Sequence, residues 1–150
     1  MKTIFRLILA LSVLAAAVSC GEKDKGPAVS EKIVAEWHLV GVSGMTSVPQ
    51  VYVDFAQDMS FELYQKVGEG RYRKYEGTYT VAGSVVSGQY SDGEKWGSDY
   101  KASFEGEKMT LTAQNGSEEA CTYEKKALSD TDKAEAVLVT KSIEDCPRFL

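Results

Sequence analysis

The sequence has few of the residues that build most catalytic and metal sites. Its 150 residues include one histidine, His38, and three cysteines. We therefore expect no zinc site of clustered Cys and His ligands, and a histidine general base would have to be His38. No Gly-x-Ser-x-Gly motif is present, and spacing singles out no pair among the 22 acidic residues. We expect a protein that is not an enzyme and holds neither a metal nor a cofactor.

Long apolar runs are also scarce, and the one at the start of the chain has the features of a signal peptide. Leu7–Val18 is almost unbroken but too short for a permanent membrane span, which needs about 20 residues. Lys2 and Arg6 precede it and small residues, Ala15 to Ala17, lie near its end, as in a signal peptide. The alternative is an ordinary secretory peptide in which Cys20 is an incidental thiol.

The end of this run, Ala17-Val18-Ser19-Cys20, resembles the lipobox of bacterial lipoproteins. The resemblance implies that residues 1–19 are removed and that Cys20 carries the acyl chains. It also implies attachment to the outer membrane of the cell envelope, since Gly21 follows the cysteine, with the periplasmic or surface face left open. Two or three acyl chains hold a protein stably on a bilayer, whereas one does so only marginally.

The mature chain is acidic and begins with a polar segment. Removal of Lys2 and Arg6 changes the net charge from −5 to −7. Residues 20–32 are predicted to be the lipidated cysteine and a flexible stalk, and residues 33–150 the folded domain. Basic and aromatic residues alternate in Gly70–Tyr75, but an exported acidic chain lacks the positive field that attracts phosphates. We expect no nucleic-acid partner.

Two cysteines, Cys121 and Cys146, remain after lipidation of Cys20. They can pair in an oxidising envelope, where the crosslink would stabilise the fold by about 3 kcal/mol. Two buried free thiols are the alternative, because spacing alone does not give the geometry.

From Ile33 to Lys126 apolar residues alternate with polar ones, the pattern of half-buried strands. Eight such runs are present, with apolar residues on one face: Trp37 and Leu39; Val51, Val53 and Phe55; Phe61 and Leu63; Tyr75, Gly77, Tyr79 and Val81; Val86, Gly88 and Tyr90; Tyr100, Ala102 and Phe104; Met109, Leu111 and Ala113; Cys121 and Tyr123. Short turns join most of them, including Asn115-Gly116, which favours a type I′ hairpin turn. An eight-stranded antiparallel meander avoids exposed edges by closing into an up-and-down barrel.

The chain beyond the eighth strand has a helical pattern. Ser129 followed by Asp132 predicts an N-cap, and Ala134, Val137 and Leu138 at helical spacing predict a short amphipathic helix that packs against the barrel. The tail, Cys146 to Leu150, ends in Phe149 and Leu150, which favours docking rather than fraying.

Five segments make the chain resemble the lipocalin-like domains of small bacterial lipoproteins of the Bacteroidota: Ala35-Glu36-Trp37-His38-Leu39, Val51-Tyr52-Val53-Asp54-Phe55, Ser60-Phe61-Glu62-Leu63-Tyr64, Tyr75-Glu76-Gly77-Thr78-Tyr79 and Met109-Thr110-Leu111-Thr112. The resemblance covers residues 33 to about 126. It implies an all-β lipocalin-like barrel in which Trp37 has a structural role at one end. The chain departs from the family in having Ala35 in place of the glycine of Gly-x-Trp, and Lys125 and Lys126 in place of an arginine on the last strand.

Two functions fit this pattern. In the first, the barrel binds a small hydrophobic or amphipathic ligand, with candidate contacts from eight inward aromatic or loop residues: Phe55, Phe61, Tyr75, Tyr79, Tyr90, Trp96, Tyr100 and Phe104. In the second, these side chains fill the barrel, and the protein acts through its loops as an accessory or inhibitory partner of an envelope protein. Trp96 is central to both, because it is either exposed as an anchor or folded back as a plug.

Overall fold

The computed structural model describes residues 27–66, 68–141 and 147–150. The predicted signal peptide, Cys20 and Cys146 lie outside the described residues. The elements, in chain order, are α1 (Val29–Lys32), β1 (Ala35–Val42), β2 (Gln50–Phe55), β3 (Ser60–Lys66), β4 (Arg73–Ala82), β5 (Val85–Tyr90), β6 (Tyr100–Glu105), β7 (Lys108–Ala113), β8 (Ala120–Lys125), α2 (Asp130–Glu135) and β9 (Val137–Leu138).

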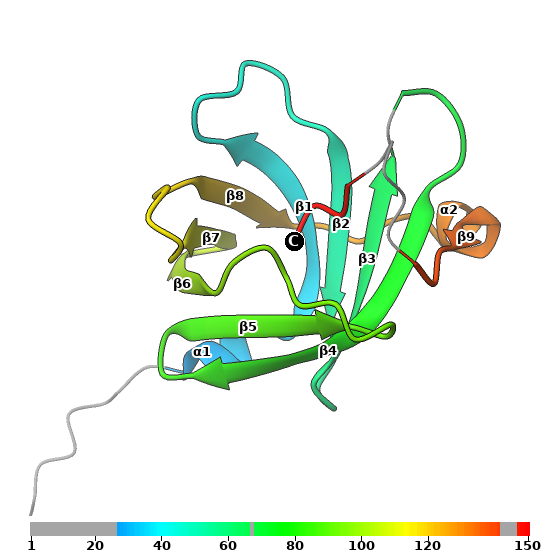
Figure 1. The fold of residues 1–150 in the computed structure, drawn as a ribbon. Helices are drawn as coiled ribbons and strands as arrows, with labels where there is room; N and C mark the ends of the chain where they lie inside the picture. Colours follow the sequence, from blue (N-terminus) through cyan, green and yellow to red (C-terminus); the bar gives the residue numbers. More distant parts are fainter. Residues whose placement is uncertain (1–26, 67, 142–146) are drawn as a thin grey trace, which may run out of the picture.

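Strands β1 to β8 form the predicted closed antiparallel barrel (Figure 1). Each strand pairs with the next along the chain, and β8 returns to pair with β1, for example Leu39 with Tyr123. Four loops therefore lie at one end of the barrel, which we call the upper end, and their described residues are 43–49, 68–72, 91–99 and 114–119. The all-β, eight-stranded prediction is confirmed.

Alternation decides which side chains face inward. Val51, Val53 and Phe55 of β2 are fully buried inside the barrel, as are Met109 and Leu111 of β7. The interior also takes Ile33 from before β1 and Leu150 from the tail, so the core is larger than the eight strands alone supply.

The lower end of the barrel is closed by α1 and Trp37. The indole Nε1 of Trp37 donates a hydrogen bond to the Ile33 carbonyl oxygen (2.8 Å), and its ring is fully buried. Lys125 Nζ lies 5.7 Å from the centre of this ring. Residues 29–32, expected to be the end of a flexible stalk, form α1, so the ordered domain begins before residue 33.

The predicted helix after β8 begins where expected but is shorter. Ser129 Oγ accepts a hydrogen bond from the Asp132 amide (3.1 Å), which confirms the N-cap. The prediction that Val137 and Leu138 continue the helix is wrong: they form β9, parallel to β4, and are about half exposed. At this point the edge of β4 facing away from β3 has no partner among the barrel strands, and β9 covers its open hydrogen-bonding groups.

No residue of the helix α2 is buried, and its contact with the barrel wall is polar, from Lys133 to Glu36 of β1. The prediction of an apolar helix face against the barrel is therefore wrong. Leu128, just before the helix, provides an apolar contact. It packs outside the barrel against the outward-facing Tyr52, Tyr64 and Tyr72. In Figure 1 the helix lies on the side of the barrel opposite β6, β7 and β8. No helix in the described residues is long and apolar enough to cross a membrane.

Candidate functional site

The aromatic residues predicted to line a ligand cavity lie inside the barrel, but they pack against one another. Ring centres are 4.9 Å apart for Phe55 and Tyr79 and 5.5 Å apart for Phe61 and Tyr90. Tyr75 lies 6.1 Å from Tyr90. Each of these five side chains is at most 3% exposed. Among the candidates, Phe104 alone lies apart, half-buried at the lower end and 5.9 Å from Trp37.

Trp96 fills the space between these rings. Its ring centre lies 5.1 Å from that of Phe61, 6.2 Å from Phe55 and 6.1 Å from Tyr100, and the side chain is 6% exposed. Of the two alternatives for this residue, the structure shows the plug rather than the exposed anchor.

The backbone of the 91–99 loop explains why Trp96 points inward. Strands β5 and β6 pair at only two positions, Val85 with Lys101 and Val86 with Tyr100. Beyond them the loop replaces β6 beside β5, since the Trp96 amide donates to the Gly88 carbonyl oxygen (3.0 Å) and the Tyr90 amide to that of Glu94 (2.8 Å). Gly88 has no side chain, so the indole lies directly against the strand; a Cβ there would come within 2.0 Å of Trp96 Cε2.

Several polar atoms are buried with these rings. Tyr79 donates from its hydroxyl to the Ala56 carbonyl oxygen (2.8 Å). The Tyr123 hydroxyl and Trp96 Nε1 are buried with no hydrogen-bond partner among the described residues. Burial disfavours the charged phenolate, so it raises the pKa of Tyr100 to about 12 and that of Tyr123 well above its ordinary value of 10.

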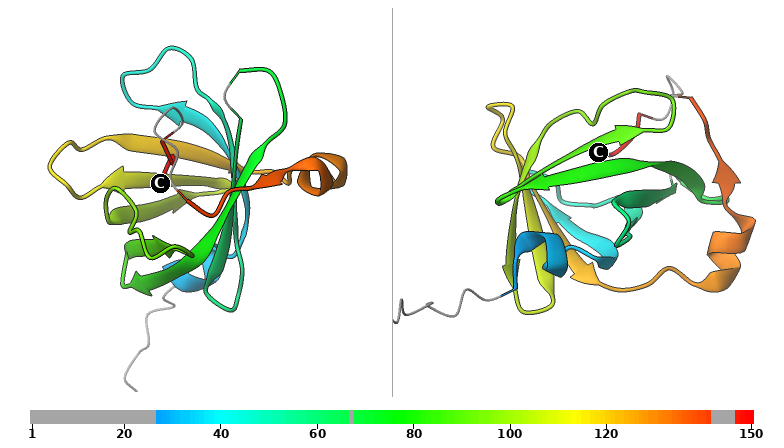
Figure 2. Two further views of the ribbon diagram at one scale, coloured as in Figure 1. Left: turned by 45° about the vertical axis from the view of Figure 1, so that its right-hand side comes forward. Right: turned by 90° about the horizontal axis from the view of Figure 1, so that it is seen from below.

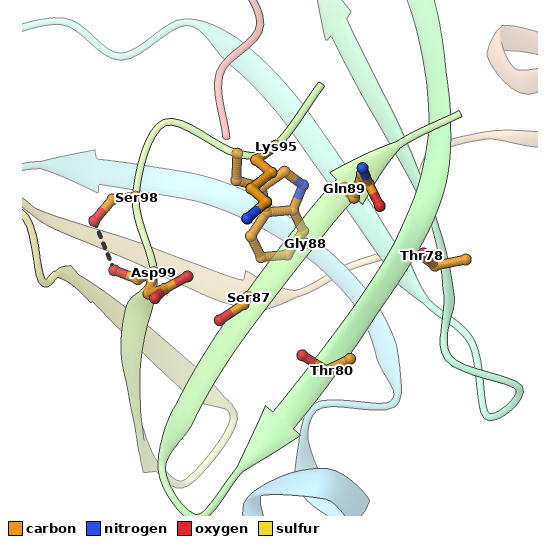
Figure 3. Close-up of a pocket in the computed structure, with 9 residues that line it drawn as sticks. Thr78, Thr80, Ser87, Gly88, Gln89, Lys95, Ser98 and Asp99 are labelled. Carbon is orange, nitrogen blue, oxygen red and sulfur yellow. Dashed lines mark hydrogen bonds between the residues drawn. The ribbon is translucent and has the colours of Figure 1, made fainter. Parts of the chain in front are cut away.

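An open groove runs over the outer wall of the barrel, where β5 and β6 separate. It has a volume of about 510 Å³ and is lined by Thr78 and Thr80 of β4, Gly88 with Ser87 and Gln89 of β5, and Lys95, Trp96, Ser98 and Asp99 of the loop (Figure 3). An adjoining hollow of about 430 Å³ shares Thr78 and Gln89 with it. Hydroxyl, amide, ammonium and carboxylate groups therefore face one surface that is within the usual size range of small-ligand sites.

Sequence reasoning missed this groove because its residues are ordinary polar positions on outward faces. The register brings them together: Thr78 pairs with Gln89 and Thr80 with Ser87. The alternation of these strands indicates that the side chains point outward. No local sequence feature indicates that β5 and β6 separate.

A row of carboxylates on the outside of β1 to β4 was also not predicted. Glu36, Asp54, Glu62 and Glu76 are successive partners across the four strands. Lys133 Nζ lies 2.5 Å from Glu36 Oε1, and Lys74 Nζ contacts both Glu62 (2.6 Å) and Glu76 (2.8 Å). Burial, and then the neighbouring Glu36, raise the pKa of Asp54 above its ordinary value. The lysines offset the repulsion expected between like charges directly opposite one another.

The histidine considered as a general base lies on the outer wall of the barrel. His38 faces outward and stacks on Tyr52, with ring centres 4.3 Å apart. Burial, and then the charge of Lys126, lower the pKa of His38 below 6.5. No group of three or more His, Cys, Asp or Glu side chains in this part of the chain is arranged to hold a metal ion.

Cys121 on β8 is buried and forms no disulfide bond within the described residues. Burial raises its pKa to about 11, so it is a poor nucleophile at neutral pH. Because Cys146 lies outside the described residues, its pairing with Cys121 stays a prediction.

No protein-family model matches the sequence, and none of the curated proteins is significantly similar to it.

Proposed function

We propose that the protein is a lipid-anchored, non-enzymatic binding protein of the bacterial envelope that recognises its ligand on the outer wall of the barrel. One observation carries this proposal: the inward positions are occupied by packed rings, with Trp96 at 6% exposure, while the groove beside it is open. The second function that fits the sequence also has a filled barrel, but there the loops bind a protein partner, whereas here the ligand lies on the outer wall.

The chemistry of the groove indicates a polar ligand. Thr80, Ser87 and Gln89 offer hydroxyl and amide groups that both donate and accept hydrogen bonds, and Lys95 and Asp99 add one charge of each sign. A hydroxyl-rich molecule such as an oligosaccharide can use such a surface at several points. The Trp96 ring lies beneath the strand, so ring stacking on a sugar is not part of this proposal.

A small apolar or amphipathic ligand inside the barrel, as the lipocalin resemblance implies, is the second candidate. The buried Tyr123 hydroxyl and Trp96 Nε1 favour it, since neither has a hydrogen-bond partner in the described residues. Such a ligand would have to displace Trp96 or Leu150, both of which lie in the core.

Native mass spectrometry of the protein isolated from its own envelope tests both candidates and the anchor together. We expect a mass increment for the acyl chains at Cys20, and this increment should be absent from Cys20→Ala. In a separate labelling experiment, the wild-type protein should incorporate radiolabelled palmitate and Cys20→Ala should not. Equal palmitate labelling of both proteins would contradict the anchor.

Amide chemical shifts recorded during titration with soluble oligosaccharides locate the ligand site. We expect perturbations at Ser87, Gln89 and Ser98, and about threefold to tenfold weaker binding in Thr80→Val, which removes one hydrogen-bonding hydroxyl. Thr112→Val makes the same change on the outer side of β7 and should leave affinity unchanged. Perturbations confined to inward residues such as Tyr123, or equal effects of the two variants, would argue against the groove.

A further inference from the structure

Residues 147–150 enter the upper end of the barrel as a short segment bound by side chains of the domain (Figures 1 and 2). Gln65 of β3 holds its backbone: Nε2 donates to the Pro147 carbonyl oxygen (2.8 Å) and Oε1 accepts from the Phe149 amide (3.1 Å). Gln65 is 5% exposed. The side-chain amide of Gln65 thus forms hydrogen bonds with two backbone groups of the segment, and these bonds do not depend on which side chains the segment carries.

The next contact is specific for a guanidinium group. The Arg148 side chain is 5% exposed, and its guanidinium carbon lies 4.2 Å from the ring centre of Tyr90 and 5.4 Å from that of Tyr75. Asp92 accepts from both terminal nitrogens (2.6 and 3.1 Å), and Glu94 accepts from Nη1 (2.9 Å). A planar fork between aromatic faces and a bidentate carboxylate suits arginine, whereas lysine offers one point charge.

An apolar contact follows. Leu150 is 4% exposed and belongs to the barrel core, and its backbone oxygen accepts from the Tyr90 hydroxyl (2.8 Å). Phe149 packs against the same core. The domain therefore binds three features of the segment in turn: its backbone, the guanidinium group of Arg148 and the aliphatic side chain of Leu150.

Groups that belong to the domain make every one of these contacts. Arg148 is the cation that lies against Asp92, Glu94 and the Tyr90 ring, so removal of the segment would take this positive charge away from the two carboxylates. Any occupant that replaces the segment must supply a positive charge and an apolar group to restore these contacts.

We propose that the upper end of the barrel is a recognition site for an extended peptide of a partner protein that carries arginine two residues before a leucine-like side chain, and that residues 147–150 are its built-in occupant. The tethered segment binds at high effective concentration, so a partner peptide competes with it. This site is separate from the groove and stands independently of the function proposed for that surface.

The test uses the acetylated peptide Pro-Arg-Phe-Leu and the full chain with Arg148→Ala, which weakens the internal occupant. We expect the peptide to bind this variant at least tenfold more tightly than wild type, as measured by calorimetry, and to raise its melting temperature. The peptide Pro-Ala-Phe-Leu should bind at least tenfold more weakly. Addition of Asp92→Asn should abolish the difference between the peptides, whereas Asp99→Asn, on the same loop but not in contact with Arg148, should preserve it.

Equal binding of the two peptides, or no binding of either to the folded variant, would overturn the proposal. If Arg148→Ala fails to fold, the proposal can be tested on the wild-type protein by NMR of ¹³C-labelled leucine methyl groups. Excess Pro-Arg-Phe-Leu should then shift the Leu150 methyl signals from their buried position to that of a free side chain, and unchanged signals would refute the site.

Discussion

Replacement of Gly88 by alanine should destabilise the protein because Trp96 occupies the space of the new methyl group. The added Cβ would lie 2.0 Å from Trp96 Cε2 and 2.4 Å from Cδ2 and Cζ2. Carbon atoms in ordinary contact are about 3.5–4.0 Å apart, so the ring would have to move by about 1.5 Å. It is confined by Phe55, Phe61 and Tyr100, so this overpacking should cost about 1–3 kcal/mol of unfolding free energy.

Urea unfolding followed by circular dichroism measures this cost. With a slope of about 2 kcal/mol per molar urea, the midpoint should fall by about 0.5–1.5 M. Gly97→Ala is the matched control in the same loop, because a Cβ there meets nothing within 4 Å, and its effect should stay within about 0.5 kcal/mol.

The double variant isolates the contact. Trp96→Ala alone should cost about 3–5 kcal/mol, as expected for a large aromatic side chain in a core. In that background Gly88→Ala should be close to neutral, because the atoms that it would meet are gone, which gives a coupling energy of about 1–3 kcal/mol. A cost of Gly88→Ala that is the same in both backgrounds would refute the position of Trp96 and, with it, the filled barrel.

Three further outcomes follow from buried groups. Stability should fall between pH 10 and 12, because unfolded tyrosines ionise near pH 10 while burial raises the pKa of Tyr100 to about 12; each such residue contributes up to about 1.4 kcal/mol per pH unit, measurable by urea unfolding across this range. Cys121, with its pKa raised to about 11, should react slowly with iodoacetamide at pH 8 and rapidly in urea, and a lack of reaction in urea without reductant would show that it is paired. Trp37→Phe leaves the Ile33 carbonyl oxygen unsatisfied and should cost about 1–3 kcal/mol in thermal unfolding; no change would show that α1 does not depend on this bond.

The strands could be predicted because alternation is a local property. Each inward residue of β2 and β7 was identified from its neighbours two positions away, and the structure buries them. The Ser129 N-cap was predictable for the same reason, because its partner Asp132 is three residues on.

The length of the turn between β7 and β8 and the end of the helix α2 were harder to predict. Asn115-Gly116 does reverse the chain, but β7 and β8 are joined by the six residues 114–119 rather than by a two-residue turn. The Asn115 side chain accepts hydrogen bonds from both the amide (3.0 Å) and the hydroxyl (2.7 Å) of Ser117, which stabilises a longer loop. Val137 is not helical because its amide donates to the carbonyl oxygen of Tyr72 (2.8 Å), the residue just before β4, and this partner is far away in the sequence.

The carboxylate row and the tail contacts had no local signal. Glu36, Asp54, Glu62 and Glu76 are not evenly spaced in the sequence and meet only through strand register. Arg148 and Asp92 are 56 residues apart, and nothing near either residue indicates the other.

By itself the sequence determined which side chains face into the barrel, because that choice repeats every two residues along an extended strand. Only the tertiary structure decided what the interior holds. Its free space depends on closure of β8 onto β1, on where β5 and β6 separate, and on the entry of Trp96 and Leu150, and each of these depends on contacts between segments distant in the chain.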